Sequence, residues 1–482
     1  MNKKNIFRLL MIFICISVGA YFLRGEVFPG SFDVENTTHK IIFDRMQDFS
    51  GATLVNLDST PEEEIFIAGF GSSNLMLKRS QDKFFPLAIP ELEDPYGMTF
   101  AVSACDLDGD GRDEILLLNR PKDGSDLSRP RILKYSQDRW GDILDPKSLV
   151  VEDIKMGYAA TCIDRKGDRK YGLAVTNENG KIAYLEVVDA QLKNIASEIG
   201  LGLSSRGRSV MGVPNMFGRV NIFVGNEDGA NFFFINKGDG TFINKADESN
   251  LSDEKFDARG ISLIDSNHDE IPDLVYGNHY GPLRLMEQTR EEKFVNVATE
   301  EMGQSYAVNA PVSGDFNLDG YEDIYLNNIR GDNKVFARFK KTWFELPIDV
   351  LKEKEMFGIS TLAGDLDNNG SYDILNNHGD GSKFPVTFYS IRPVHPWIKF
   401  SVRYANGGIP RGAVLRLRTN MNDKLLFISS GSGRFANYDP IVTASVERGE
   451  EVRVLEVILP SGKRLEFKKN FTTMTTHDLI IR

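Results

Sequence analysis

The sequence feature that most constrains the fold is an acidic nine-residue pattern that recurs about every fifty residues. In the four strong copies, oxygen-bearing side chains occupy positions 1, 3, 5 and 9, and short apolar runs lie on both sides. Three weaker copies keep the apolar flanks and lose most of the acids, so that first positions fall at residues 56, 106, 164, 213, 265, 315 and 365. A fixed period of this length indicates a repeat architecture. The oxygen-bearing residues of the strong copies are Asp106, Asp108, Asp110 and Glu114; Asp265, Asn267, Asp269 and Asp273; Asp315, Asn317, Asp319 and Asp323; and Asp365, Asp367, Asn369 and Asp373.

Each repeat is predicted to form four short strands. In the second repeat we expect them at residues 99–105, 114–119 and 131–135, with a weaker one at 143–151. Apolar and β-branched runs separated by Gly, Asn and Asp favour strands over helices. Four strands per unit, repeated radially, are typical of a β-propeller, whereas the coils of a β-solenoid are shorter. The sequence therefore predicts an all-β fold that contains a seven-bladed β-propeller.

The acidic loops have the composition of calcium sites. Calcium takes about six to eight oxygen ligands, and Gly111, Gly320 and Gly370 at position 6 permit a sharp turn, where the fifth repeat has Glu270. An EF-hand is excluded because position 12 is never Glu and a strand follows. A plain turn needs no metal, but the clustered carboxylates would then repel one another. We expect about four structural calcium ions, each tying the first strand of a blade to the second.

These loops carry a family resemblance. The pattern D-x-[DN]-x-[DN]-G-x-x-[DE] between two strands resembles the FG-GAP/VCBS repeat of integrin α-subunit heads and of many exported bacterial proteins. Residues 231–242, Asn-Phe-Phe-Phe-Ile-Asn-Lys-Gly-Asp-Gly-Thr-Phe, are similar to a strand pair common in this group. The resemblance covers roughly residues 40–395, and it implies a seven-bladed propeller over residues 41–395 with calcium on one face.

The C-terminal segment, residues 396–482, has a different pattern. An N-G-x-G-A-like run at 406–413, Ser-Gly-Ser-Gly at 430–433, Asp439-Pro440 and Pro-Ser-Gly at 460–462 resemble the ASPIC/UnbV domain. That domain follows FG-GAP-type repeats in cartilage acidic protein and its bacterial relatives. The sequence departs from the family where Gly-Ile-Pro-Arg precedes Gly412 and where residues 443–446 replace the usual F-G-L-G. The resemblance implies a small antiparallel β-domain and no assigned chemistry.

The N-terminus has the pattern of an export signal. Lys3, Lys4 and Arg8 precede an apolar run at residues 9–23, which ends at Arg24. A cleaved signal peptide and a membrane anchor formed by residues 6–23 both fit residues 1–24, and residues 25–40 are expected to be a linker. Either alternative places the rest of the chain in the periplasm, at the cell surface or in the medium. Cys105 and Cys162 lie in apolar strand-like runs, and we expect small core residues there rather than a disulfide.

No nucleophile, metalloprotease, redox or P-loop motif occurs in the sequence. A formal charge of −12 also argues against a nucleic-acid partner. Thirteen residues after each first position most repeats carry Asn, which suits a turn. Alternatively, polar and aromatic groups there form a ligand-binding rim on the face opposite the calcium loops, with Asn278, His279, Tyr280 and His378 as its candidates.

The function expected from these features is that of an exported, calcium-stabilised propeller that binds a protein or glycan partner, without a catalytic residue or organic cofactor. The alternative is an enzyme or an accessory factor of secondary metabolism of the UnbV type. An enzyme should have a cluster of convergent polar groups in the central channel or at the interface with the C-terminal domain. A binding protein should have an exposed rim of aromatic and polar groups. The C-terminal segment 393–482 holds 14 Lys and Arg against 8 Asp and Glu, so it is expected to dock on the acidic repeats.

Overall fold

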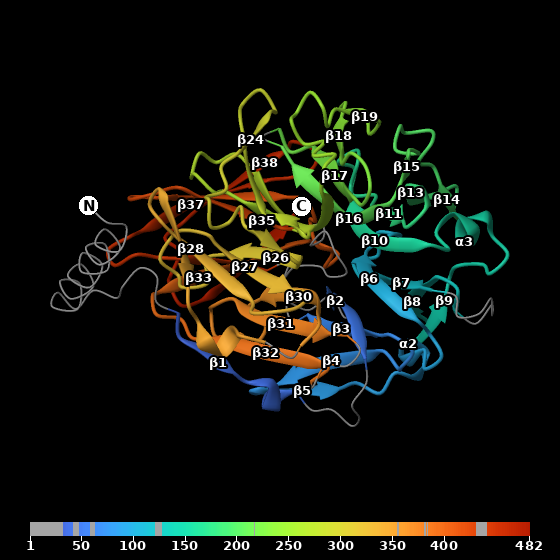
Figure 1. Ribbon diagram of the computed structural model, residues 1–482, viewed down its shortest axis with the longest axis horizontal. Coiled ribbons are helices and arrows are strands. Elements are labelled where there is room, and N and C mark those ends of the chain that lie inside the picture. Colours follow the sequence, from blue (N-terminus) through green and yellow to red (C-terminus); the bar gives the residue numbers. More distant parts are fainter. Residues whose placement is uncertain are drawn as a thin grey trace.

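Figure 1 shows an all-β chain whose sheets follow one another around a ring, with the C-terminal strands behind it. The computed structural model describes residues 32–41, 48–57, 63–120, 128–215, 217–353, 356–379, 382, 384–429 and 441–482. Within these residues, seven four-stranded antiparallel sheets cover residues 34–391. The first strand of each sheet packs against the first strand of the next, and β30 of the last sheet packs against β2 of the first. The arrangement is therefore that of a β-propeller.

Six of the sheets are built from consecutive segments of the chain. In chain order they are β2 (Phe49–Val55), β3 (Glu64–Gly69), β4 (Leu75–Ser80) and β5 (Lys83–Pro86); β6 (Thr99–Cys105), β7 (Glu114–Asn119), β8 (Arg131–Ser136) and β9 (Arg139–Asp142); β10 (Gly157–Ile163), β11 (Gly172–Asn177), β13 (Ala183–Val188) and β14 (Gln191–Asn194); β16 (Gly207–Pro214), β17 (Val220–Asn226), β18 (Phe232–Asn236) and β19 (Phe242–Asn244); β20 (Asp257–Ile264), β21 (Asp273–His279), β23 (Arg284–Gln288) and β24 (Phe294–Asn296); and β26 (Val308–Gly314), β27 (Asp323–Asn328), β28 (Lys334–Phe339) and β29 (Thr342–Leu346).

The last sheet joins the two ends of the repeat region. It contains β30 (Gly358–Gly364), β31 (Asp373–His378) and β32 (Val386–Ile391), and its fourth strand is β1 (Val34–Asn36) from the N-terminal side. Val34 pairs with Ile391 and Asn36 with Tyr389. Residues 34–36, expected in a linker, are thus part of the ring and close it through backbone hydrogen bonds.

A separate apolar cluster lies between each pair of neighbouring sheets. The cluster between the last and first sheets includes Phe388 and Leu375 on one side and Phe49 and Leu77 on the other. Because each sheet is covered on both faces, its inner strands are nearly continuous runs of buried residues, as in β2 and β7. Burial between sheets therefore explains why the repeats show apolar runs rather than an alternating pattern.

Short elements connect the sheets. These are η1 (Thr38–Lys40), α2 (Pro90–Glu93), α3 (Leu149–Asp153), η3 (Asp349–Leu351) and two small ladders, β12 (Gly180–Lys181) with β15 (Ser204–Ser205) and β22 (Gly281–Pro282) with β25 (Ser305–Tyr306). The expected strand at 143–151 is wrong: β9 lies earlier, and α3 occupies part of that range. Val150 and Val151 are buried from this helix, so their apolar character reflects packing beneath a helix rather than a strand.

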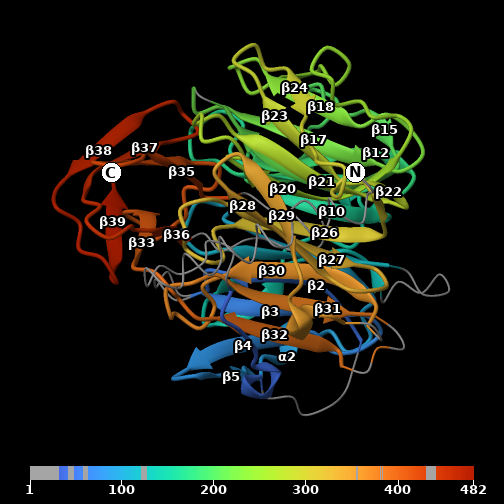
Figure 2. The ribbon, with the colours of Figure 1, turned by 60° about the vertical axis from the view of Figure 1, so that its left-hand side comes forward.

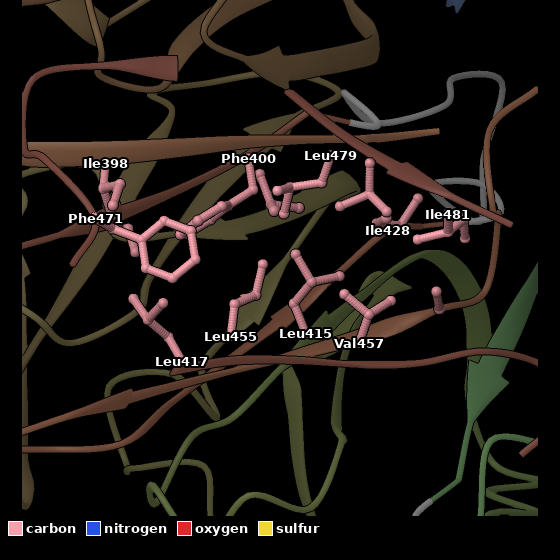
Figure 3. Packing of buried hydrophobic residues seen from close by; sticks show 14 of the residues in the cluster. Ile398, Phe400, Leu415, Leu417, Ile428, Leu455, Val457, Phe471, Leu479 and Ile481 are labelled. Atoms are coloured by element: carbon pink, nitrogen blue, oxygen red, sulfur yellow. The ribbon is translucent and has the colours of Figure 1, made fainter. Parts of the chain in front are cut away.

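The C-terminal residues form two sheets beside the ring (Figure 2). One contains β36 (Val442–Ser445), β33 (Trp397–Tyr404) and β39 (Thr476–Ile481), and the other contains β35 (Lys424–Phe427), β34 (Val414–Thr419), β37 (Val452–Ile458) and β38 (Arg464–Lys468). Their apolar faces share one core, in which Phe400 and Leu479 lie opposite Leu415 and Leu455 (Figure 3). The expectation of a purely antiparallel domain is wrong in one pair, because β33 and β39 run parallel.

Cys105 and Cys162 form a disulfide, contrary to the expectation of two core thiols. Their Cα atoms are 5.4 Å apart, which suits a disulfide. Cys105 ends β6 and Cys162 lies in β10, so the bond joins the innermost strands of neighbouring sheets. The two residues are about one repeat apart in sequence, which brings them to equivalent places in adjacent sheets.

Candidate functional site

The four acidic loops lie at one edge of the ring. Each connects the first strand of its sheet to the second, as β6–β7, β20–β21, β26–β27 and β30–β31. In every loop the backbone N–H of position 6 donates to the carboxylate of position 1, at 3.0 Å from Gly111 to Asp106 and 2.8 Å from Gly370 to Asp365. Position 6 has φ of +93° at Gly111 and +95° at Gly370, a conformation that glycine adopts without strain. The loops therefore share one curled backbone.

Two of these loops gather three carboxylates each. Ligand oxygens of Asp106, Asp108 and Glu114 lie within 4.8 Å of one another, and those of Asp365, Asp367 and Asp373 do the same. Asp106, Glu114 and Asp373 are buried, and the Oδ1 atom of Asp365 is buried without a hydrogen-bond partner among the described residues. A buried unpaired carboxylate oxygen is costly. Oxygen groups at this spacing, with one acceptor unused, fit a hard divalent cation.

The other two loops carry Asn at position 3. Asn267 donates to Asp269 at 3.1 Å, and Asn317 donates to Asp319 at the same distance. The remaining carboxylates also collect backbone donors, as where Asp273 accepts from Gln288 at 2.7 Å. These loops keep the curled geometry with three carboxylates at the four ligand positions, as many as the loop at Asp365 and one fewer than the loop at Asp106.

Burial raises the pKa of several loop carboxylates. The pKa of Asp106 rises to about 7 and that of Glu114 to about 8, with neighbouring carboxylates adding to the effect of burial. In the fifth repeat burial raises the pKa of Asp265 to about 7 and that of Asp273 to about 8. A raised pKa means that the ionised form is disfavoured at that place. Bound cations would favour the ionised form and remove this penalty.

Protein cations stand beside two of the clusters. The Nζ atom of Lys134, from β8, contacts Asp108 and lies 2.9 Å from Asp110 and 3.0 Å from Glu114. The Nζ atom of Lys399, from β33, lies 2.6 Å from Asp365. Neither lysine could be assigned to the loops from the sequence, because one comes from another strand and the other from the C-terminal domain. Each ammonium group offsets part of the negative charge of the carboxylates beside it.

The C-terminal domain covers this loop face. Arg411 pairs with Asp113 at 2.7 Å, and Asn406 donates to the carbonyl oxygen of Gly109 at 2.9 Å. Arg418 contacts Glu270 in the fifth repeat. The basic residues of the C-terminal domain thus contact the acidic loops directly, and these contacts hold the domain against the ring.

The residues expected to form a ligand-binding rim do not all lie at the surface. Tyr280 is 72% exposed and its ring centroid lies 4.0 Å from that of His279. Asn278 is buried and donates to the carbonyl oxygen of Pro282 at 2.8 Å. Equivalent Asn side chains at 177, 226 and 328 also donate to the carbonyl four residues on, at 2.6 Å in each case. These Asn residues therefore hold the turn between the second and third strands.

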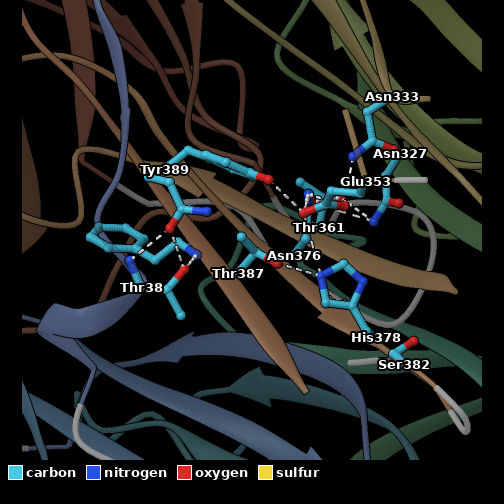
Figure 4. Close-up of polar contacts among 12 residues, drawn as sticks. Thr38, Asn327, Asn333, Glu353, Thr361, Asn376, His378, Ser382, Thr387 and Tyr389 are labelled. Atoms are coloured by element: carbon cyan, nitrogen blue, oxygen red, sulfur yellow. Dashed lines mark hydrogen bonds and ion pairs between the residues drawn. The ribbon is translucent and has the colours of Figure 1, made fainter. Parts of the chain in front are cut away.

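His378 lies in a buried polar network rather than at the surface (Figure 4). Its Nε2 atom is 2.6 Å from the hydroxyl of Thr387 and 3.4 Å from Glu353. Glu353 also accepts from Asn333 at 2.7 Å and from Tyr389 at 2.8 Å. Burial opposes ionisation of Glu353, but these hydrogen bonds outweigh it and hold its pKa below the ordinary value. The network fixes the segment after η3 to β31 and β32.

Comparison with known proteins supports the resemblance to FG-GAP repeats. Residues 265–326 match the FG-GAP-like repeat. The chain contains an FG-GAP-like repeat. It is also similar to Cartilage acidic protein 1 of Homo sapiens, with 28% identity over 513 residues, covering 96% of this chain and 76% of that protein. Cartilage acidic protein 1 of Mus musculus is 29% identical over 456 residues, covering 86% and 70%. The similarity to the human protein spans both the ring and the C-terminal domain.

Solved structures match the chain at low sequence identity. The BP39L lectin from Burkholderia pseudomallei matches with a TM-score of 0.49 and 13% identity, covering 72% of this chain and 97% of that one. YCF48 bound to D1 peptide matches with a TM-score of 0.45 and 9% identity, covering 75% and 95%.

Among the described residues, no helix has the length and apolar character needed to cross a membrane. The predicted signal or anchor at residues 1–24 lies outside the described part.

Proposed function

We propose that this chain is an exported, seven-bladed β-propeller whose acidic loops bind about four structural calcium ions and whose surface recognises a protein or polysaccharide partner. The residues proposed to hold calcium are those at positions 1, 3, 5 and 9 of the four strong loops. The observation that carries the proposal is the set of three carboxylates that converge in the loops at Asp106 and Asp365, with Oδ1 of Asp365 unpaired. That oxygen would be a ligand of the calcium ion, and the ion's positive charge would offset the repulsion among the carboxylates.

Export is supported by the disulfide and by the N-terminal pattern. Disulfides persist in oxidising compartments and are rare in the cytosol. The bond between Cys105 and Cys162 would therefore favour a periplasmic, surface or secreted location, where calcium is also available. The basic and apolar residues 1–24 would supply the export signal or a membrane anchor.

A binding role is supported by the difference between the two faces of the ring. The C-terminal domain occupies the loop face through pairs such as Arg411 with Asp113. The opposite face carries the strand-connecting turns, including the exposed Tyr280. A rigid ring with variable turns on an open face is a suitable platform for a partner, because the sheets position the turns and the turns supply recognition.

The test of the calcium proposal is thermal unfolding of the exported chain. The protein is freed of metal with chelator and dialysed, and melting is then recorded with and without added calcium. Calcium is expected to raise the melting temperature, because it binds only the folded loops. Magnesium at equal concentration is the control, since its smaller octahedral shell fits these loops less well. An unchanged melting temperature with calcium would contradict the proposal.

One observation favours the enzymatic alternative, namely a cavity of about 210 Å³ between the ring and the C-terminal domain. Its walls include Glu63, Lys78, Asp365 and Lys399. Burial raises the pKa of Glu63 to about 8, although Arg403 lies beside it. Perturbed titratable groups in a cavity are a feature of many active sites. Glu63→Gln tests this alternative, because an activity found in the wild type should be lost in that variant while the fold persists.

A further inference from the structure

The first strand of each of the seven sheets has a β-bulge near its start, within the described residues. The bulges lie at the edge of the ring opposite the acidic loops, because each strand runs from its bulge towards its loop. A bulge takes one residue out of the ladder and redirects its side chain. These residues therefore occupy equivalent places at the inner end of every sheet.

On one side of the ring the bulges are joined by short neutral hydrogen bonds. Ser360 donates to the carbonyl oxygen of Ser50 at 2.5 Å, and Ser50 donates to that of Thr99 at 2.6 Å. Asn309 donates to the carbonyl oxygen of Gly358 at 2.8 Å. Small polar side chains are thus sufficient to connect neighbouring bulges.

On the other side the equivalent places hold Phe100, Tyr158, Arg208 and Arg259. The ring centroids of Phe100 and Tyr158 are 4.8 Å apart. The guanidinium of Arg208 lies 4.3 Å from the ring of Tyr158, and Arg120, which follows β7, lies 4.1 Å from that of Phe100. These large aromatic and cationic groups exceed what joining the strands requires.

In the described part of the chain, the positive groups of this cluster outnumber the carboxylates that pair with them. Glu178 pairs with Arg120 at 3.1 Å and with Arg208 at 3.2 Å. Glu227 pairs with Arg259 at 3.1 Å and also contacts Arg208. Among the described residues, three guanidinium groups therefore share two carboxylates. The Nε atom of Arg120 is buried without a hydrogen-bond partner among the described residues, so a donor remains unused.

Solvent reaches the cluster from the face opposite the acidic loops. The side chains of Arg120 and Glu178 are 25% and 22% exposed. Two apolar side chains that are each 37% exposed lie next to it: Phe70, whose ring is 6.2 Å from that of Phe100, and Met156, whose carbonyl accepts from Glu178. Arg and aromatic side chains are enriched among residues that dominate binding energy at protein interfaces.

We propose that this arginine–aromatic cluster, formed by Phe100, Arg120, Tyr158, Arg208 and Arg259, is the site where a protein partner inserts a carboxylate that is followed or preceded by an apolar side chain. The carboxylate accepts from the partly exposed guanidinium of Arg120 and supplies a third negative charge, and the apolar side chain packs on Phe70 and Met156. Arginine suits this role because its planar donors match a carboxylate. The inference rests on the proposed binding function and names the chemistry of the partner.

The test uses peptides. A phage-displayed library of random heptapeptides is selected on the immobilised chain under non-reducing conditions, and enriched sequences are synthesised with their acidic residue or with its amide. We expect enriched peptides to pair Asp or Glu with an apolar residue, and the amide form to bind at least about tenfold more weakly, as for loss of a charge-assisted hydrogen bond. Enriched peptides without an acidic residue, or the absence of enrichment, would overturn the assignment.

Two variants and one control locate the site. Arg120→Gln should weaken the acidic peptide about tenfold, whereas Glu178→Gln should strengthen binding, because it removes the carboxylate that competes with the peptide. Arg206→Gln, which removes a 42%-exposed arginine near the cluster, should change binding less than about twofold. Equal effects of Arg120→Gln and Arg206→Gln would overturn the site and leave a binding function standing. The calcium melting experiment is independent of all these outcomes.

Discussion

The buried ion pair between Arg411 and Asp113 allows a quantitative test of how the C-terminal domain is attached. The two side chains are 2% and 3% exposed and lie 2.7 Å apart. The same oxygen of Asp113 accepts the backbone N–H of Asn56 at 3.0 Å. Arg411→Met removes the charge and keeps much of the side-chain volume, so Asp113 would be left as a buried carboxylate with one backbone donor. We expect a loss of about 3–5 kcal/mol, the usual cost of removing one partner of a buried pair.

The assay is urea unfolding followed by circular dichroism, with the first transition analysed because a chain of this size need not unfold in one step. The double variant Arg411→Met/Asp113→Asn should recover most of the loss, since Asn still accepts from Asn56 and no buried charge remains. Arg453→Met is the matched control. Arg453 is 60% exposed and pairs with an exposed Glu451, so its loss should cost less than about 1 kcal/mol.

Two outcomes would refute this reasoning. A loss below about 1 kcal/mol in Arg411→Met would mean that the pair is solvated in solution, because an exposed pair is worth no more than that. An equal loss in the single and double variants would mean that the arginine acts through packing alone and not through its charge.

Three further predictions follow from other parts of the ring. Reduction of the disulfide between Cys105 and Cys162, or substitution of both by Ser, should lower the free energy of unfolding by about 2–4 kcal/mol in urea titrations. In the metal-free protein, the raised pKa values of Asp106 and Glu114, about 7 and about 8, mean that the folded state binds protons more tightly than the unfolded state. Stability of that form should therefore rise as pH falls from about 8 towards 6, and the gain from added calcium should shrink over the same range, both measured by melting curves. Asn278→Ala should cost about 1 kcal/mol or more in urea unfolding, because the carbonyl that it bonds would lose its donor.

The repeat made most of the ring predictable from the sequence. Three expected strands of the second repeat, at 99–105, 114–119 and 131–135, agree with β6, β7 and β8 within one residue. The inner strands are predictable because both of their faces are buried, which produces continuous apolar runs. The fourth strand was misplaced since β9 is short, lies on the outside of the ring and contains Arg139, Gly141 and Asp142, none of which favours a strand.

Features that depend on contacts between distant segments could not be predicted. The pairing of β1 with β32 requires the ring to close, and a three-residue strand carries no pattern of its own. The disulfide was missed because apolar surroundings suit a buried thiol equally well; only the spacing of one repeat between Cys105 and Cys162 pointed to adjacent strands. Lys399 reaches Asp365 from another domain, and no local sequence signal connects them.

The central claim, that the acidic loops are calcium sites, is tested most directly by counting bound ions. Equilibrium dialysis of the metal-free chain against radioactive calcium gives the stoichiometry. Asp106→Asn and Asp373→Asn, at positions that carry a carboxylate in all four strong loops, report on individual loops. We predict about four ions per chain, with one fewer in each variant. Binding of no calcium at millimolar concentration, or a stoichiometry that neither variant changes, would contradict the account.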